Sequence, residues 1–155
     1  MDGKSAKPAR NGDSVGRGML TSLIGYHLRR AQIAVFQHFA AAMGEAEITP
    51  GQFGVLTVIN SNPGLSQTQL GNALGIDRST VVAVIDRLQS RGLVVRAVAP
   101  TDRRSHALRL SDEGGRLLHR LEELVRSHER HIARDLSAAD KQRLIELLDR
   151  VARRD

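Results

Sequence analysis

The residues with the most evident chemistry follow Asp77 at helical spacing and combine long hydrogen-bond donors with small side chains. The outer face carries Arg78, Ser79, Val82, Ala83, Asp86 and Arg87, and Thr80 is also among the first exposed positions; all of these except Asp86 are candidate DNA-binding residues. Guanidinium and hydroxyl groups hydrogen-bond to base edges in the major groove of DNA, and small apolar groups contact the thymine methyl. We expect Arg78 to bind guanine or phosphate, and Arg87, which lies farther along, to bind a phosphate. The pattern indicates a helix that reads a DNA sequence.

Two neighbouring segments carry groups suited to the DNA backbone and minor groove. The preceding predicted helix begins with Ser66, Gln67 and Thr68. Free amides at such a helix start favour a phosphate oxygen. A later hairpin tip carries Asp102, Arg103 and Arg104. One arginine can pair with the aspartate while the other enters a narrow minor groove, whose negative potential attracts guanidinium; the sequence leaves open which arginine does which.

Turn and capping signals place these groups on a helix-turn-helix unit followed by a β-hairpin. The motif Ser66–Gln69 has the pattern of a capping box and predicts a short helix up to Leu74. Asp77 caps the next helix, which ends near Arg91 before Gly92. The remaining predicted elements of this unit are strands at 94–98 and 106–110 and an exposed loop at 100–104.

Long amphipathic helices are predicted on either side of this unit. Apolar residues recur at three- and four-residue steps from Leu20 to Phe39 and predict one helix over 19–43, ended by Gly44. Further helices begin at the caps Thr49, Ser111 and Ser137. The first helix and the last two carry apolar stripes with little else in the chain to cover them. We therefore expect a second copy of the chain as partner.

Composition narrows the class of protein. The 155 residues carry 23 Lys and Arg against 17 Asp and Glu, and the net charge of +6 favours a polyanion as partner. The absence of cysteine excludes disulfides and thiol-based redox sensing, and the absence of Trp argues against stacking on single-stranded nucleic acid. No apolar run reaches the roughly 20 residues of a membrane helix, and residues 1–17 lack a signal-peptide core. We expect a cytoplasmic protein without a membrane partner.

Three motifs together carry a family resemblance. They are the helix-turn-helix LSQTQLGNALGIDRSTVVAVIDRLQSRGLV, the wing PTDRRSHALRLSDEG and the upstream segment ITPGQFGVL. Through them residues 49–118 resemble the MarR (multiple antibiotic resistance regulator) family of winged-helix transcription factors. The resemblance implies a mostly α-helical fold with a small β-hairpin wing. We divide the chain into a flexible N-terminal tail at 1–18, a helical dimerisation region at 19–48 and 111–155, and a winged helix-turn-helix DNA-binding region at 49–110.

The resemblance also implies a homodimeric repressor. In such proteins the outer helices of two subunits intertwine, and two recognition helices meet successive major grooves of palindromic double-stranded DNA, about 10 base pairs apart. Family members commonly release DNA when a small aromatic or phenolic acid, or its thioester, binds between the two regions. Candidate ligand-binding residues, which offer cations among apolar walls to an anionic aromatic compound, are Tyr26, His27, Arg29, Arg30, His38 and Phe53.

Two other functions stay open on sequence alone. The first is an architectural protein that coats DNA without sequence preference, which a salt titration would distinguish. The second is a metal-responsive regulator of the same fold, since His128 and His131 lie three apart and His38 or His119 could join them. Without cysteine or a carboxylate–histidine cluster we expect no metal and no cofactor, and without a nucleophile elbow, phosphate loop or HExxH motif we expect no enzyme. The operator, the effector, the regulated genes and the choice between repression and activation are not visible in the sequence.

Overall fold

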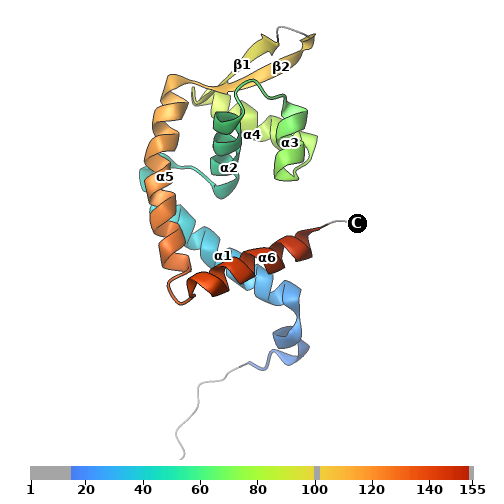
Figure 1. The fold of residues 1–155 in the computed structure, drawn as a ribbon, viewed down its shortest axis with the longest axis vertical. Coiled ribbons are helices and arrows are strands. Elements are labelled where there is room, and N and C mark those ends of the chain that lie inside the picture. The colour runs from blue at the N-terminus through green and yellow to red at the C-terminus, as the bar shows by residue number, and fades with distance from the viewer. Residues whose placement is uncertain (1–14, 100–101, 154–155) are drawn as a thin grey trace, which may run out of the picture. The chain divides into compact units, whose positions relative to one another are not determined.

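The structure is a computed structural model that describes residues 15–99 and 102–153, without the side chains of 98, 99 and 102–106. Most of the predicted tail lies outside the described residues. The described residues fall into two compact units, one ending at Ala34 and one beginning at Val35. The elements are η1 Gly18–Ser22, α1 Ile24–Met43, η2 Gly44–Ala46, α2 Pro50–Ser61, α3 Gln67–Leu74, α4 Arg78–Ser90, β1 Val94–Ala99, β2 Asp102–Leu110, α5 Asp112–Ile132 and α6 Ala138–Ala152 (Figure 1). The predicted mostly α-helical fold with a small hairpin is confirmed.

Short side-chain caps determine where the helices begin. The Thr49 hydroxyl accepts a hydrogen bond from the Gln52 amide at 3.2 Å, and the Gln52 side chain accepts one from the Thr49 amide at 3.0 Å. Such reciprocal bonds satisfy amides that have no partner within the helix. The same capping box begins α3 at Ser66 and α6 at Ser137, while Asp77 and Ser111 cap α4 and α5 through one side-chain acceptor each. All five predicted caps are confirmed.

The predicted single helix over 19–43 is wrong at its beginning. Gly18–Ser22 forms a separate 3₁₀ turn, and Leu23 has an extended backbone before α1 starts at Ile24. The hydroxyls of Thr21 and Ser22 donate to the carbonyls of residues 18 and 19 at 3.3 and 2.8 Å. Hydroxyls that bond to nearby carbonyls offer the chain an alternative to a continuous α-helix. The apolar spacing continues across this break and therefore hid it.

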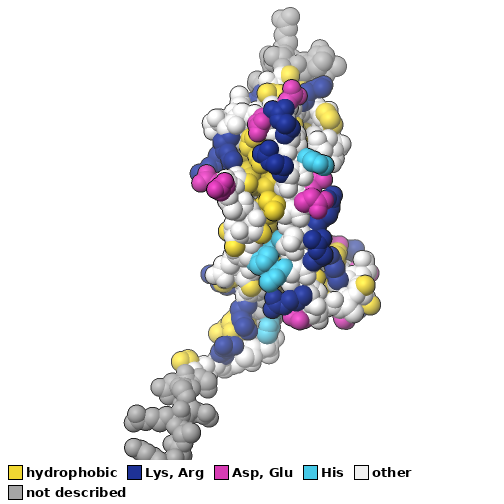
Figure 2. All heavy atoms as spheres, turned by 90° about the vertical axis from the view of Figure 1, so that its left-hand side faces the viewer, with side chains coloured by type: hydrophobic (Ala, Val, Ile, Leu, Met, Phe, Trp, Pro, Cys, Tyr) yellow, Lys and Arg dark blue, Asp and Glu magenta, His cyan; other side chains and the backbone are white. Residues whose placement is uncertain are grey.

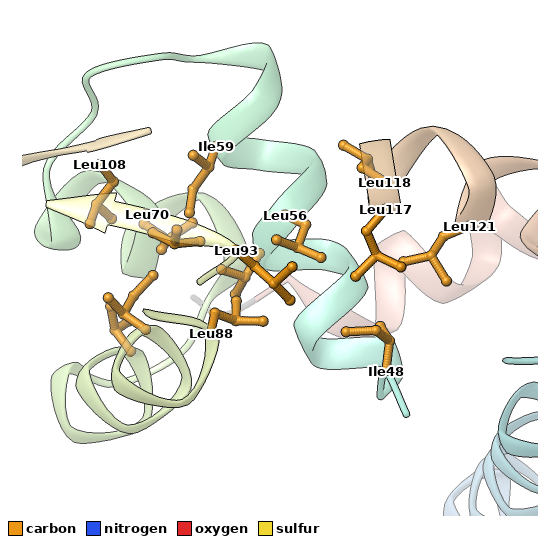
Figure 3. Close-up of a cluster of buried hydrophobic side chains, with 14 of the residues drawn as sticks. Ile48, Leu56, Ile59, Leu70, Leu88, Leu93, Leu108, Leu117, Leu118 and Leu121 are labelled. Atoms are coloured by element: carbon orange, nitrogen blue, oxygen red, sulfur yellow. The ribbon is translucent and has the colours of Figure 1, made fainter. Parts of the chain in front are cut away.

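The core of the second unit joins α2, α3, α4, the hairpin and α5. Its most completely buried side chains are Val55, Leu56, Ile59, Leu70, Val81, Ile85, Leu88, Val94, Leu108 and Leu121. Figure 3 shows the leucines of α5 on the side of Leu56 on α2, and Leu108 beside Leu70. Burying one such side chain stabilises the fold by about 1.5–3 kcal/mol. This shared core holds the two helices of the helix-turn-helix and the hairpin in one arrangement.

The hairpin of β1 and β2, called the wing below, is longer than predicted. The strands are antiparallel, with Val94 opposite Leu110, and Ala99 pairs with Asp102 after an irregularity. Because that pair leaves only two positions between the strands, residues 102–104 belong to β2, and the predicted loop over 100–104 is wrong. The wing is also tied to the α2–α3 connection, since the Leu108 amide donates to the Leu65 carbonyl at 2.9 Å.

The apolar side of α6 is partly exposed among the described residues. Its large hydrophobic side chains are between 38% and 54% exposed, and they are Leu144, Ile145, Leu147, Leu148 and Val151. Its amphipathic pattern is that of a helix that packs on another surface. In the described part of the chain, no helix has both the length and the hydropathy to span a lipid bilayer.

Candidate nucleic-acid interface

The helix-turn-helix consists of α3, a short turn and α4, which lie beside α2 and the wing in Figure 1. Gly75 ends α3 with a φ of 64°, a left-handed conformation that glycine adopts without strain. Gly71 also permits the close crossing of the two helices, because a β-carbon there would lie 3.0 Å from the Ile76 carbonyl oxygen and 3.1 Å from a Val81 methyl. The glycines at these two positions thus allow α4 to cross α3 closely.

The first turn of α3 places the predicted phosphate-binding residues at one helix end. The Ser66 hydroxyl accepts from the Gln69 amide at 3.2 Å, and the Gln69 side chain accepts from the Ser66 amide at 2.8 Å. The amides of Ser66 and Gln69 are therefore occupied by the capping box. Those of Gln67 and Thr68 are the first-turn amides that an anion could approach.

Asp77 organises the first turn of α4. Its carboxylate accepts hydrogen bonds from the Ser79 hydroxyl at 2.5 Å, the Thr80 amide at 2.9 Å and the Thr80 hydroxyl at 2.7 Å. These bonds, led by that from Ser79, lower the pKa of the Asp77 carboxyl well below its usual value. Because both hydroxyl protons point at Asp77, Ser79 and Thr80 present oxygen lone pairs outward.

The two sides of α4 differ sharply in exposure. Val81, Ile85 and Leu88 are at most 1% exposed and face the core. The other side carries the candidate DNA-binding residues, of which Arg78, Ser79, Thr80, Ala83 and Arg87 are exposed and Val82 is half-buried. The structure therefore brings the predicted α4 set together on one exposed surface.

The wing carries the remaining predicted contacts. The backbone of Asp102, Arg103 and Arg104 forms the first part of β2. The side chains of these residues lie outside the described ones, so the predicted pairing of Asp102 with one arginine is neither supported nor contradicted.

Two arginines that the sequence did not single out connect α4 to its surroundings. Arg96 of β1 places Nη2 2.5 Å from Oδ1 of Asp86 on α4. Arg91, at the end of α4, donates from Nη1 to the Glu47 carbonyl at 3.0 Å and from Nη2 to the Ala46 carbonyl at 2.9 Å. The one signal for Arg96 is a charged residue within an otherwise apolar strand, VVRAVA. Nothing in the sequence signals the contact of Arg91 with two backbone carbonyls.

The face formed by α5 differs from this surface. Figure 2 shows Lys and Arg side chains there interspersed with Asp and Glu side chains, and a group of histidines near the middle of the view with other histidines apart from it. Ion pairs along α5 include Arg116 with Glu113 at 2.8 Å and Arg126 with Glu122 at 3.3 Å. A surface of mixed sign attracts a polyanion less than one on which positive charge predominates.

The six predicted ligand-binding residues are divided between the two units. In the unit ending at Ala34, Tyr26 lies edge-on to His27 with ring centroids 5.4 Å apart, and the Arg30 guanidinium lies 5.6 Å from the Tyr26 ring centroid. Arg29 is exposed in the same unit. In the other unit Phe53 is half-buried against the core, with its ring centroid 6.4 Å from that of Phe39. His38 belongs to this second unit.

His38 of α1 joins two histidines of α5. A hydrogen bond links Nδ1 of His38 and Nδ1 of His128 at 2.7 Å, one of them donating, and the His131 ring stacks on His38 with centroids 3.9 Å apart. Burial and the neighbouring His38 lower the pKa of His128, and desolvation and His38 lower that of His131. Within residues 15–99 and 102–153, no group of three or more His, Cys, Asp or Glu side chains is arranged to hold a metal ion. The cluster is thus a hydrogen-bonded stack.

Comparison with known proteins gives consistent results. The model of the MarR family matches residues 46–105. A Thauera aromatica protein named as a transcriptional regulatory protein for the hcr operon is 42% identical over 139 residues, which span 89% of this chain and 84% of that protein. The two chains therefore correspond over nearly their whole length.

Solved structures agree. The transcriptional repressor CouR bound to a 23-mer DNA duplex is 40% identical, with a TM-score of 0.86 over 91% of this chain and 100% of its own. CouR bound to p-coumaroyl-CoA is 37% identical, with a TM-score of 0.83 over 91% and 99% of the two chains. The PcaV regulator of Streptomyces coelicolor with its natural ligand is 34% identical, with a TM-score of 0.82 over 86% and 94%. The chain belongs to the MarR family and is a winged-helix transcriptional regulator rather than an enzyme.

Proposed function

We propose that the chain is a homodimeric repressor that binds a palindromic DNA site and releases it when a small aromatic or phenolic acid, or its thioester, binds. The observation that carries the DNA-binding part is the exposed side of α4, where Arg78 and Arg87 stand free of the core. A helix held by its buried side on a shared core can enter a major groove with its other side. The similarity to CouR, which was solved on a DNA duplex, supports this role.

The proposed DNA contacts have separate tasks. Amides at the start of α3 and the hydroxyl of Thr68 bind phosphate, and Arg78 with the Ser79 and Thr80 oxygens reads base edges. Outward lone pairs on these two hydroxyls suit the amino groups of adenine and cytosine, which are donors in the major groove. Val82 and Ala83 contact a thymine methyl, Arg87 contacts phosphate, and the wing residues 102–104 follow the adjacent minor groove.

The partly exposed apolar surface supports the proposed homodimer. The apolar side of α6, from Leu144 to Val151, is partly exposed throughout. In the unit ending at Ala34 the apolar side chains of Leu20, Leu23, Ile24 and Leu28 are at least 36% exposed. A second copy of the chain that covers both surfaces removes this apolar area from water and presents two copies of α4 to a twofold-symmetric site.

The effector class is supported by the relatives. CouR was solved with p-coumaroyl-CoA and PcaV with its natural ligand. In this chain Tyr26 and Arg30 combine an aromatic ring with a cation, a pair that suits an aromatic carboxylate. Release of DNA requires that the effector favour a dimer whose two copies of α4 are spaced wrongly for successive grooves. Such a regulator works in the cytoplasm, where its DNA lies.

The experiment is a fluorescence anisotropy titration on DNA from upstream of the chain's own gene. A scrambled duplex of equal length is the control. We expect the upstream site to bind at least about 10³-fold more tightly at physiological salt, and p-coumaroyl-CoA, p-coumarate or benzoate to weaken that binding. Equal affinity for both duplexes would favour an architectural protein. Sedimentation of the free protein as a monomer would contradict the homodimer.

A further inference from the structure

Asp86 places a carboxylate on the side of α4 that carries the proposed DNA contacts. Arg78, Val82 and Asp86 follow one another at steps of four residues, so they form one line along the helix. The Asp86 side chain is 56% exposed. An unpaired carboxylate in this line would repel the DNA phosphates that the adjacent Arg87 is proposed to bind.

Arg96 of the wing neutralises this carboxylate. Its Nη2 lies 2.5 Å from Oδ1 of Asp86, whereas its own side chain is only 22% exposed. Within the described part of the chain, its Nε is buried without a hydrogen-bond partner. A guanidinium that has lost this much hydration depends on the carboxylate with which it pairs.

The backbone of Arg96 is firmly held. Val94 and Arg96 point to the same side of β1, and Val94 is buried in the core. Across the wing Arg96 is opposite Leu108, which is fully buried and bonded through its backbone to Leu65. The side chain of Arg96 therefore extends from a fixed point of the wing to the outer side of α4.

We propose that Arg96 is a positioning residue for DNA recognition, which holds the wing against α4 through Asp86 and neutralises that carboxylate without itself contacting DNA. Neither residue belongs to the predicted DNA-binding set. The inference rests on the proposed function of α4 and the wing. It explains why a carboxylate is tolerated on the helix side that reads DNA.

The salt dependence of binding separates this role from a direct phosphate contact. We compare the wild type, Arg96→Ala, Arg96→Lys and Asp86→Asn on one operator. Arg96→Ala should lower the specific affinity about tenfold or more, with an unchanged slope of log affinity against log salt. Arg96→Lys keeps the positive charge but not the planar guanidinium, so its specific affinity should lie between those of the wild type and Arg96→Ala. A slope reduced by about 0.9 in Arg96→Ala, with no effect of Asp86→Asn, would assign Arg96 to a phosphate and overturn the proposal.

Arg116→Ala is the matched control. It also removes one positive charge from an ion pair, with Glu113 on α5, but both partners are more than half exposed. Its affinity and salt slope should equal those of the wild type. An equal loss in Arg116→Ala would show that net charge, rather than position, accounts for the effect and would overturn the proposal.

Charge reversal tests the pair itself. Asp86→Arg and Arg96→Asp should each lower the specific affinity, and the double variant should regain part of the loss, because the two charges are again opposite. Thermal unfolding of each variant establishes that it is folded. A double variant in which the two losses simply multiply would contradict a role that acts through the pair.

Hydrogen exchange tests the position of the wing without DNA. Backbone amides of β1 should exchange faster in Arg96→Ala than in Arg116→Ala, because β1 has lost its ion pair with α4. Equal exchange would overturn the proposal. The exchange measurement tests the role of Arg96 in holding the wing even if the wild type prefers no operator. Such a lack of preference would refute the proposed function but not this structural role.

Discussion

Gly114, in the first turn of α5, faces Leu93 so closely that a β-carbon on Gly114 would lie 2.0 Å from the Leu93 carbonyl oxygen. The same oxygen accepts a hydrogen bond from the Ser111 amide at 3.0 Å. The Ser111 hydroxyl in turn donates to the Gly92 carbonyl at 2.5 Å. The start of α5 therefore packs directly on the segment that leads from α4 into the wing.

Replacing Gly114 by Ala should destabilise the protein. The added β-carbon would meet backbone atoms of Leu93, which cannot move aside as the end of a flexible side chain can. We therefore expect the free energy of unfolding to fall by about 1–3 kcal/mol or more. Chemical denaturation followed by circular dichroism measures this change. The control is Gly115→Ala, where no heavy atom lies within 4 Å of the added carbon. It should raise the stability by up to about 1 kcal/mol, since alanine favours a helix. Equal stability of Gly114→Ala and the wild type would show that the contact does not require glycine.

The histidine cluster should make the stability depend on pH. The lowered pKa values of His128 and His131 mean that the folded state holds fewer protons than the unfolded state just below the ordinary value of 6.5. Their contribution to the free energy of unfolding is therefore fully present above pH 6.5 and is lost as the pH falls from there through the lowered pKa values of the folded state. Denaturation at about pH 7.5 and about pH 5.5 should show the loss.

Two variants test this origin of the pH dependence. His38→Gln removes the neighbour that disfavours protonation of both α5 histidines and should reduce the dependence. His119→Gln, at an exposed position on the same helix outside the cluster, should leave it as in the wild type. The hypothesis fails if His38→Gln loses as much stability as the wild type on acidification.

Arg78→Ala should weaken specific DNA binding by about 1–3 kcal/mol per half-site if the guanidinium reads a base edge, as proposed. Titrations on the operator and on a scrambled duplex measure the change in preference. Arg116→Ala serves again as control. An unchanged preference with a smaller salt slope would instead place Arg78 on a phosphate.

The double variant Arg103→Ala and Arg104→Ala should bind DNA more weakly and with a flatter salt dependence. Each lost phosphate contact reduces the slope of log affinity against log salt by about 0.9. Titration over a range of salt concentrations gives the slope. A wing that does not touch DNA would leave the slope at the wild-type value.

Deleting residues 138–155 should produce a monomer or an aggregate in analytical sedimentation, because it removes the partly exposed apolar side of α6 on which the proposed dimer depends. Leu148→Glu should weaken the dimer as well. Gln142→Glu, on the opposite side of α6, introduces the same charge and should leave the dimer intact. A well-behaved dimer of the truncated chain would show that α6 is dispensable for association.

Local signals made the helix-turn-helix predictable. Each helix start at Thr49, Ser66, Asp77, Ser111 and Ser137 depends on a side chain and an amide three residues later, so the sequence alone contains the interaction. The same locality explains why the outward-facing residues of α4 could be predicted from helical spacing. The extent of β2 was missed, because the polar residues 102–104 have the composition of a turn and their strand pairing depends on Ala99.

Contacts between distant segments were harder to predict. The pair of Asp86 and Arg96 depends on how the wing packs beside α4, which no spacing in the chain reports. The histidines were singled out as candidate metal ligands, and the structure does bring His38 to His128 and His131. The three histidines are joined by one hydrogen bond and by ring stacking. Whether neighbouring histidines stack in this way or converge on a metal ion depends on angles and distances that the composition does not encode.

Arg91 connects the C-terminal end of α4 to main-chain oxygens of Ala46 and Glu47. Main-chain oxygens cannot rotate away as side chains do, and Glu47 is itself held in a left-handed conformation with a φ of 48°. The connection between α1 and α2 and the C-terminal end of α4 therefore move together unless both bonds break. A displacement of that connection would thus reach α4 through the side chain of Arg91.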